Sequence, residues 1–207
     1  MVIDQSTGLP LQDSQDGKVG DPTPDFTFGF RNTFTYKGFE LSFLLDWRKG
    51  GDVYNGTSGV LRNFGVSDET LDRNDAVVFS GVAADNEGNP TENINTVETV
   101  IGGTDGSSNY HQAYGFVGLD ELAIEDGGWV RLRDISLSYN LPSSILSNTP
   151  FMTVNVTLNA RNLFLITDYS GIDPETNLTG SSSNVFSYDY FNNPNTKSYG
   201  IKINVTL

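Results

Sequence analysis

The sequence predicts an all-β fold in which five antiparallel strands each have one apolar and one polar face. Three observations lead to this prediction. Apolar and polar residues alternate along five segments, short and long connections alternate between the segments, and aromatic residues mark both ends of the apolar rows. Successive side chains of a strand point to opposite sides, so alternation places one face of each strand in an apolar environment. Transmembrane β-barrels combine such strands with tight turns at one end and large loops at the other.

Residues 1–24 read as a loop segment rich in Gly and Pro, and residues 25–49 as a β-hairpin. The first strand places Phe and Tyr on one parity, with Asn32 as the exception. The second does the same from Phe39 to Trp47, with Leu44 as the misfit. Lys37-Gly38 between the two strands predicts a tight hairpin turn.

Residues 50–128 are expected to form a long extracellular loop, because the alternation is lost and Gly, Asn, Asp and Ser dominate. Within this stretch, 77–79 and 97–101 are candidates for short strands, and 120–124 for one helical turn. An irregular stretch of this length is unusual in a compact domain but acceptable as a functional loop.

The alternation returns in residues 129–207, which we interpret as the last three barrel strands with the loop 167–196. The first of these strands begins at Trp129, the second covers 151–166, and the third covers 199–207. A modest turn, 142–150, joins the first two. The long loops then fall at one end of the sheet and the short turns at the other, which is the asymmetry of bacterial barrels.

Aromatic residues at the strand ends predict two interfacial girdles roughly 20–25 Å apart, at ~3.3 Å per residue and ~40° tilt. They are Phe26, Trp47, Trp129, Phe164 and Tyr199 on the loop side, and Tyr36, Phe39, Tyr139 and Phe151 on the turn side. Arg131 and Arg133 share the parity of Ile135, so we place them above the apolar band, at the headgroup or loop level. Five strands cannot close such a barrel, so the chain must pair with further strands.

The composition narrows the possible functions. Lys and Arg number 12 and Asp and Glu 26 among 207 residues, a formal net charge of −14. Nucleic acid and anionic membrane surfaces require a basic footprint, so both are disfavoured as partners. Disulfide and thiol chemistry are excluded because the chain has no cysteine. We find no run of about 18 apolar residues. The first residues lack the features of a signal peptide, so we expect the chain to be part of a larger exported protein.

Several motifs together resemble the C-terminal part of SusC/RagA-type TonB-linked outer-membrane transporters. They are VGDPTPDF at 19–26, FTYKGFEL at 34–41, EDGGWVRLRDISLSY at 125–139, ARNLFLITDYSGIDPE at 160–175 and the terminal strand 199–207. The family usually ends on an aromatic residue, whereas this chain ends on Leu207. The resemblance implies that the chain supplies the C-terminal five strands of a large outer-membrane β-barrel of ~22 strands, with long extracellular loops.

The resemblance also implies a function for the whole protein. The family imports oligosaccharides or peptides across the bacterial outer membrane, powered through TonB. The implied partners are the remainder of the barrel and its plug, a SusD-like surface lipoprotein, outer-membrane lipid, and TonB through an N-terminal part that this sequence lacks. No cofactor, metal or enzymatic activity is implied. The alternatives are a soluble all-β carbohydrate-binding module and a structural barrel piece without transport.

Candidate functional residues follow from the polar rows and the loops. We expect a substrate conduit to be lined by Arg31, Glu40, Asp46, Arg48, Arg161, Tyr110, Tyr114 and Trp129, the aromatic members stacking on sugar rings. The alternative is that the charged residues pair across strands and the aromatic residues only pack.

Three further motifs have a catalytic or metal-binding interpretation beside a structural one. The single histidine, His111, lacks the framing glycines of a nucleophile elbow. Asp173 and Glu175 could form a glycosidase pair, but a turn around Pro174 is favoured. Residues 85–89 resemble a calcium loop only in part, so a β-turn is the expected structure.

Overall fold

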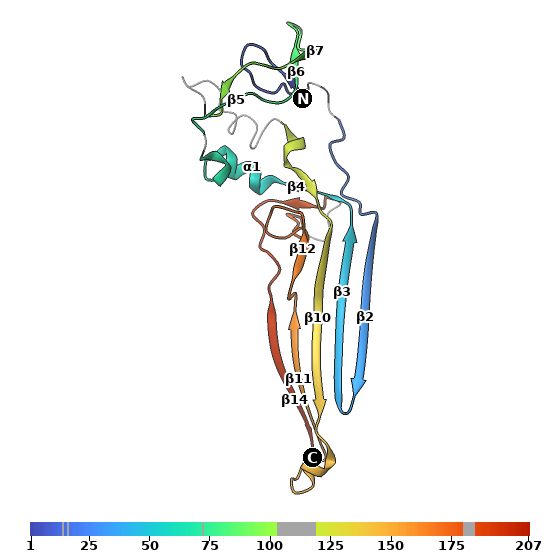
Figure 1. The fold of residues 1–207 in the computed structure, drawn as a ribbon. Helices are drawn as coiled ribbons and strands as arrows, with labels where there is room; N and C mark the ends of the chain where they lie inside the picture. Colours follow the sequence, from blue (N-terminus) through green and yellow to red (C-terminus); the bar gives the residue numbers. More distant parts are fainter. Residues whose placement is uncertain (14, 16, 72, 103–118, 180–184) are drawn as a thin grey trace. The chain divides into compact units, whose positions relative to one another are not determined.

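The computed structural model describes all residues except 14, 16, 72, 103–118 and 180–184 (Figure 1). The chain divides into two compact units. One contains Met1–Gly20, Tyr54–Ile124 and Tyr188–Phe191, and the other contains Asp21–Val53, Glu125–Ser187 and Asn192–Leu207. We call them the loop unit and the wall unit and describe each separately.

The wall unit is built on one antiparallel sheet with the strand order β14-β11-β10-β3-β2 (Figure 1). Its strands are β2 (Phe26–Tyr36), β3 (Phe39–Lys49), β10 (Trp129–Asn140), β11 (Thr153–Arg161) and β14 (Ser198–Thr206). The short strand β12 (Leu165–Thr167) pairs with the first residues of β10. These are the five predicted strands, and β2 and β14 form the two edges of the open sheet.

Short turns lie at one end of this sheet and long connections at the other (Figure 1). β2 and β3 are joined by Lys37-Gly38, where both residues have positive φ (45° and 85°). This is the conformation of a type I′ hairpin turn, which matches the twist of the strands. β10 and β11 are joined by a segment with one short helix, α3 (Ser143–Leu146). The prediction that short turns and long connections lie at opposite ends of the sheet is therefore confirmed.

The strand predicted over 151–166 is divided in two. β11 ends at Arg161, and Asn162 adopts a left-handed conformation with φ 51°. The backbone amide of Asn162 donates to the carbonyl of Arg133, and that of Leu163 donates to Leu132. Pairing with β10 then resumes in β12. The predicted alternation survives the break, because Ile166 pairs with Val130 and is 65% exposed.

The loop unit contains short elements within the stretches 1–24 and 50–128. β1 (Val2–Ile3), β6 (Val82–Ala84) and β7 (Pro90–Ile94) form a three-stranded sheet, and β5 (Ala76–Val77) pairs with β8 (Thr99–Val100). The helical elements are α1 (Gly56–Asn63), η1 (Asp68–Thr70) and η2 (Asp120–Ala123). The division between the two units falls within the strands β4 (Asp52–Asn55) and β9 (Ile124–Asp126) of the sequence. β13 (Tyr188–Asp189) runs parallel to β4.

The core of the loop unit forms around its first strand. Ile3 is fully buried, and Leu9, Ala83 and Ile101 are each less than a tenth exposed. Asn95 is also buried, and its side chain holds the surrounding backbone by donating to the carbonyl of Phe79 and accepting from the amide of Val97. Residues that precede the barrel hairpin and residues of the long loop after it therefore fold together.

Candidate functional site

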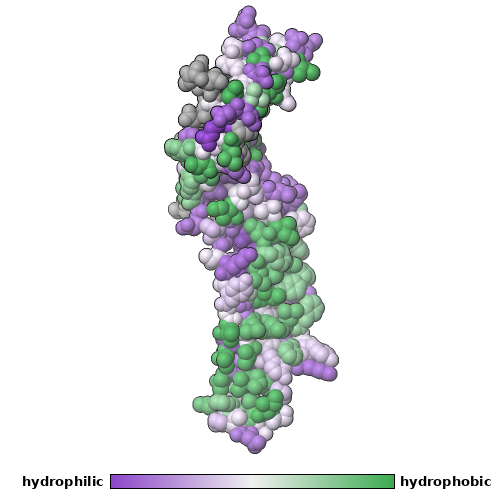
Figure 2. All heavy atoms as spheres, turned by 60° about the vertical axis from the view of Figure 1, so that its left-hand side comes forward, coloured by the Kyte–Doolittle hydropathy of each residue, from purple (hydrophilic) through white to green (hydrophobic). Residues whose placement is uncertain are grey.

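The outward face of the wall sheet is a continuous apolar surface. The register aligns apolar residues in rows across the strands, such as Leu41, Leu137, Leu158 and Ile201. Many of these side chains are strongly exposed, including Phe28 at 55%, Phe34 at 57% and Ile203 at 62%. Figure 2 shows hydrophobic side chains gathering along these strands. A soluble monomer rarely exposes apolar patches beyond a few hundred Å², so this face is suited to contact lipid.

The girdle candidates lie at the ends of these rows. Phe26 and Trp47 pack edge to face with ring centroids 4.9 Å apart, and Phe39 stacks on Tyr139 at 4.3 Å. Tyr36 (69%), Phe164 (42%) and Tyr199 (75%) are exposed on the same face. Tyr and Trp favour a membrane interface because one end of the side chain is apolar and the other is polar. The girdle role of these residues stays a prediction.

A β-bulge in β10 reverses the facing of the four residues 129–132. The register with β3 shifts between Leu132 and Asp134, which leaves Arg133 as the additional residue. Because a bulge moves every residue beyond it to the other face, Leu132 and Val130 lie outward, while Arg131 and Trp129 lie inward. The prediction that Arg131 and Arg133 share the outward face of Ile135 is therefore wrong, and so is the placement of Trp129 in the loop-side girdle, whereas the predicted loop level agrees with the pairing of both arginines with Asp173 and Glu175.

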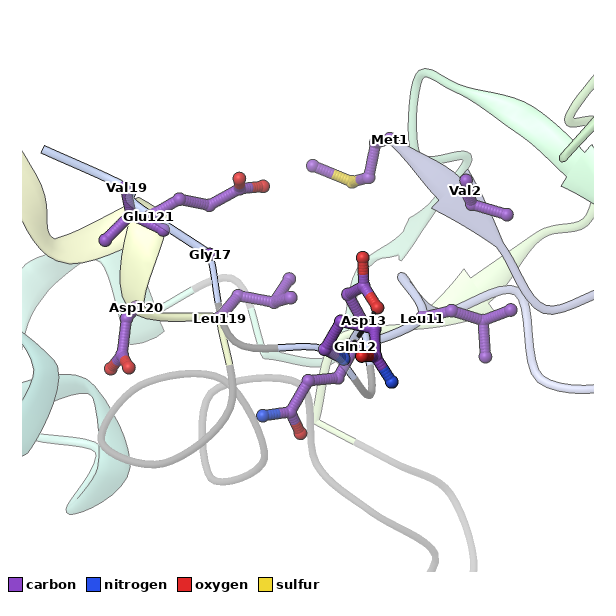
Figure 3. Close-up of a pocket in the computed structure, with 11 residues that line it drawn as sticks. Met1, Val2, Leu11, Gln12, Asp13, Gly17, Val19, Leu119, Asp120 and Glu121 are labelled. Carbon is purple, nitrogen blue, oxygen red and sulfur yellow. Dashed lines mark hydrogen bonds between the residues drawn. The ribbon is translucent and has the colours of Figure 1, made fainter. Parts of the chain in front are cut away.

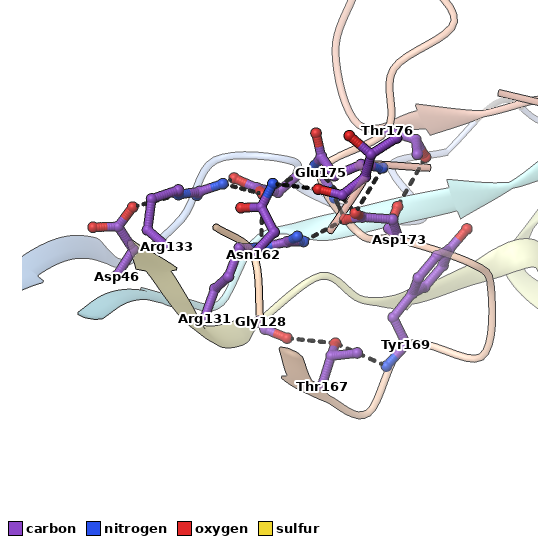
Figure 4. Close-up of polar contacts among 12 residues, drawn as sticks. Asp46, Gly128, Arg131, Arg133, Asn162, Thr167, Tyr169, Asp173, Glu175 and Thr176 are labelled. Atoms are coloured by element: carbon purple, nitrogen blue, oxygen red, sulfur yellow. Dashed lines mark hydrogen bonds and ion pairs between the residues drawn. The ribbon is translucent and has the colours of Figure 1, made fainter. Parts of the chain in front are cut away.

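The bulge directs the two arginines into a network of ion pairs on the inward face (Figure 4). Arg131 Nη2 lies 2.7 Å from Asp173 Oδ1, and Arg131 Nε lies 3.0 Å from Glu175 Oε2. Arg133 forms a two-pronged contact with Glu175, at 2.7 and 2.9 Å, and donates to Asp46 Oδ2 at 2.8 Å. The Arg131 and Asp173 side chains are only 3% and 4% exposed. A buried charge of this kind is tolerated only when it is paired, so Arg131 depends on Asp173 and Glu175.

Trp129 is part of the same network. It is 9% exposed, and the guanidinium carbons of Arg131 and Arg133 lie 5.6 and 5.3 Å from its ring centroid. These distances are within the range of cation–π attraction. Trp129 therefore packs against the network, and its position does not expose the ring as a platform for sugars.

The network also closes the long loop between β12 and β14. Asp173 Oδ1 accepts from the backbone amide of Glu175 at 3.0 Å, which forms a turn around the buried Pro174. Asp173 Oδ2 accepts from the Asn195 side chain at 3.1 Å, near the other end of the loop. Asn162 donates to the carbonyl of Thr196 at 3.0 Å. The interpretation of Asp173 and Glu175 as the carboxylates of a turn is confirmed.

A second structural feature at the loop end of the sheet is a collar made by the segments 21–25, 50–53 and 126–128. Asp21 and Asp52 exchange hydrogen bonds, and Arg48 Nη2 donates to the carbonyl of Pro22 at 2.9 Å. Gly51 has a positive φ of +81°, and a Cβ atom at this position would lie only 2.9 Å from the carbonyl oxygen of Pro22. Gly127 donates its amide to the carbonyl of Gly51 at 2.8 Å. The paired glycines on either side of the long loop are the sequence signal for this close approach.

The conduit candidates thus divide into two groups. Arg31, Glu40 and Arg161 lie on the inward face with exposed side chains, Arg161 at 68% and 3.5 Å from Asp134. Asp46, Arg48 and Trp129 are held in the network or the collar. Tyr110, Tyr114 and His111 lie outside the described residues. The pairing of Arg131 and Arg133 with Asp173 and Glu175 was not predicted from the sequence. The signal in the sequence was that the two arginines and the two carboxylates are each separated by one residue.

The loop unit contributes an acidic pocket of about 470 Å³ (Figure 3). Asp13, Asp120 and Glu121 supply carboxylates, and none of the described lining residues is Lys or Arg. Burial, followed by the nearby charge of Asp120, raises the pKa of Tyr54 to about 12. Tyr54 donates to Asp120 and stacks on Tyr188 with centroids 4.7 Å apart. This electrostatic environment disfavours negative charge.

Residues 85–89 form the turn of the β6–β7 hairpin. Asp85 Oδ1 accepts from the backbone amides of Asn89 at 2.8 Å and Glu87 at 2.9 Å. These hydrogen bonds, above all those from Asn89, hold the pKa of the Asp85 carboxyl below its usual value. The expected β-turn is therefore present. Within the described part of the chain, no group of three or more His, Cys, Asp or Glu residues could hold a metal ion.

None of the helices in the described residues is both long enough and apolar enough to cross a membrane.

Comparisons with known proteins find curated relatives of the chain. No family model matches the sequence. TonB-dependent receptor P3 of Formosa agariphila is 31% identical over 193 residues, which cover 90% of this chain and 17% of that receptor. TonB-dependent receptor P26 of the same organism is 29% identical over 192 residues, covering 89% of this chain and 17% of that receptor. The chain therefore spans about one sixth of the length of the curated relatives it matches.

Solved structures show the same fold. The RagAB peptide transporter aligns with a TM-score of 0.56 at 22% identity, covering 88% of this chain and 17% of that chain. The RagAB peptide importer in its closed-closed state aligns with a TM-score of 0.57 at 23% identity, covering 92% of this chain and 18% of that chain. These proteins are receptors and transporters, in agreement with the expectation that the chain is not an enzyme. The relatives and the solved structures therefore support the interpretation of the chain as a barrel-wall segment of a SusC/RagA-type TonB-dependent receptor of the bacterial outer membrane.

Proposed function

We propose that the chain is part of a TonB-dependent transporter that imports oligosaccharides or peptides together with a SusD-like surface lipoprotein. The observation that carries this proposal is the division of one sheet into an apolar outward face and a polar inward face. The relatives named TonB-dependent receptors and the likeness to the RagAB peptide transporter support it. The transport step requires the rest of the barrel, its plug and TonB.

Within this proposal, the inward face has two roles. Arg31, Glu40 and Arg161 line the conduit, because their side chains are exposed on the inward face. The network around Arg131 and Asp173 holds residues 173–175 and Asn195 together and is not available to a substrate, because Arg131 and Asp173 are buried and all its charges are paired. The conduit is therefore polar but carries few charges, as suits the passage of neutral sugars and mixed peptides.

Uptake by the full-length receptor tests the proposal. Cells that carry the receptor and its lipoprotein should accumulate labelled oligosaccharides or peptides, and deletion of TonB should abolish this accumulation. Arg31→Gln should change the substrate concentration for half-maximal uptake without lowering the amount of folded receptor. Uptake that persists without TonB would contradict the proposal, as would no uptake of any sugar or peptide by a correctly folded receptor.

A further inference from the structure

The outward face of the wall sheet carries a hollow of about 590 Å³ over strands β3, β10, β11 and β14. Ala160 is only 9% exposed although it lies on the outward face. The register places this small side chain between Ile135 on β10 and Tyr199 on β14. The lining continues in the next row, with Leu41, Leu137, Leu158 and Ile201.

Protruding side chains flank the hollow. Tyr199 in the row of Ala160 is 75% exposed, and Ile201 and Leu158 in the next row are 73% and 50% exposed, whereas the side chain of Ala160 ends at its Cβ atom. A row of four strands with one small residue therefore leaves a recess in an otherwise raised apolar surface. The lining is apolar except for the phenol of Tyr199 and for Asn159, which belongs to the opposite parity.

We propose that this hollow is a fixed binding site for one acyl chain of an outer-membrane lipid. The inference rests on the membrane orientation of the sheet in the proposed function. The hollow is continuous with the apolar rows that contact lipid and lies between the two aromatic girdles, at the depth of the hydrocarbon. A recess that stays empty there deprives its lining atoms of dispersion contacts, and an acyl chain restores them.

A second protein is a poorer fit than an acyl chain. Stable protein interfaces have a polar rim around an apolar centre and aromatic or Arg anchors within it. The rows above and below this hollow are apolar as well, so the recess has no polar rim. Its lining is mainly aliphatic, which suits a flexible hydrocarbon chain.

Tyr199 indicates which end of the lipid lies nearest to the loops. It pairs with Ala160 close to the loop end of β14, where its exposed phenol can reach the headgroup region. The acyl chain therefore enters from the outer leaflet and runs past Ala160 toward Leu137 and Leu41. Both outer-leaflet glycolipid and phospholipid could supply such a chain.

Native mass spectrometry of the full-length receptor extracted from outer membranes tests the proposal. Ala160→Phe fills the recess, and Val205→Phe is the matched control because Val205 lies on the same face of β14 outside the lining. Wild type and Val205→Phe should retain a lipid through detergent exchange. Ala160→Phe should retain it about tenfold less, corresponding to lost contacts with roughly two methylene groups. The retained mass identifies glycolipid or phospholipid.

Two controls keep the test decisive. Heat-modifiable electrophoretic mobility verifies folding, and Ala160→Leu replaces Ala160→Phe if the latter fails to fold. Equal lipid retention in all variants would overturn the proposal. Dissociation of a receptor dimer by Ala160→Phe with unchanged lipid would also overturn it, and would assign the recess to a second copy. Uptake measured in the same variants is independent, so loss of transport with normal lipid retention would count only against the proposed function.

Discussion

Replacing Ile135 by arginine tests the assignment of the two faces of the wall sheet. Ile135 lies outward near the middle of β10, between Phe43 on β3 and Ala160 on β11. Its partner Phe43 is four residues from both Phe39 and Trp47 of the two girdles, so at ~3.3 Å per residue and ~40° tilt Ile135 lies about 10 Å from each girdle along the membrane normal. This depth is close to the midplane of the apolar band.

An arginine at this depth costs about 2–4 kcal/mol. The folding equilibrium in the membrane should therefore fall by about 30- to 1000-fold. The measurement is urea-induced unfolding of the full-length receptor in lipid vesicles, with the amount of folded receptor in cells as a second readout. Because the cost comes from lipid exposure, it should decrease if the arginine is moved toward either girdle.

Ser136→Arg is the matched control. Ser136 is the next residue of the same strand, faces inward, and pairs with Ser42 and Asn159, which are uncharged. An arginine there enters the polar side of the wall and should lower stability by less than about 1 kcal/mol. Equal destabilisation by both substitutions, or a larger effect of Ser136→Arg, would refute the assignment of the faces.

Three further predictions concern the network, the collar and the loop unit. Asp173→Asn should destabilise the wall unit by about 3–5 kcal/mol in urea unfolding, because it leaves a buried arginine short of its partner, whereas Arg161→Gln should change stability by less than about 1 kcal/mol. Gly51→Ala should cost about 1–3 kcal/mol at its positive φ, whereas Gly17→Ala, where a Cβ meets nothing within 4 Å, should be neutral; proteolysis of the collar would distinguish them. The raised pKa of Tyr54 means that the neutral phenol is favoured by folding, so its contribution to stability is complete below pH 10.0 and is lost as pH rises to about 12. Ultraviolet absorbance titration should show this tyrosine ionising late, and Tyr54→Phe should remove the pH dependence.

The strands could be predicted because their signal is local. Alternation with period two and the Lys37-Gly38 turn fix the register of β2 against β3, including the misfits. Asn32 pairs with Phe43 on the apolar face, and Leu44 pairs with Arg31 on the polar one. Each residue of a hairpin pairs with a residue that is close in sequence, so the pairing can be predicted from the alternation and the position of the turn.

The facing of Arg131 and Arg133 was predicted wrongly because the parity of Ile135 was extended through the whole segment, whereas the ion pairs of both arginines involve residues distant in sequence. The apolar residues of this segment change parity, from Val130 and Leu132 before Arg133 to Ile135 and Leu137 after it, and this change coincides with the bulge. The bulge is supported by the left-handed Asn162 opposite it and by carboxylates 42 residues further along the chain. The arginines and the carboxylates of the network could be identified in the sequence, but the ion pairs between them could not.

Helix α1 was missed for a similar reason. Its sequence GTSGVLRN contains two glycines, which weaken a helix in isolation. Both glycines are buried in the structure, and Gly56 lies against the ring of Tyr190, from a segment more than a hundred residues later. The helix is therefore stabilised by tertiary packing that needs small residues, which local propensity cannot reveal.

The contact between Gly51 and Gly127 has a consequence for how the barrel tolerates change. It closes the long insertion between β3 and β10 at its base, so the ends of both strands meet whatever lies between them. Loop-closure entropy grows slowly, by only about 0.6 kcal/mol for each doubling of length. Insertions or deletions between 54 and 124 should therefore leave the β3–β10 register unchanged. The outer loops can then diversify among relatives while the wall below them stays constant.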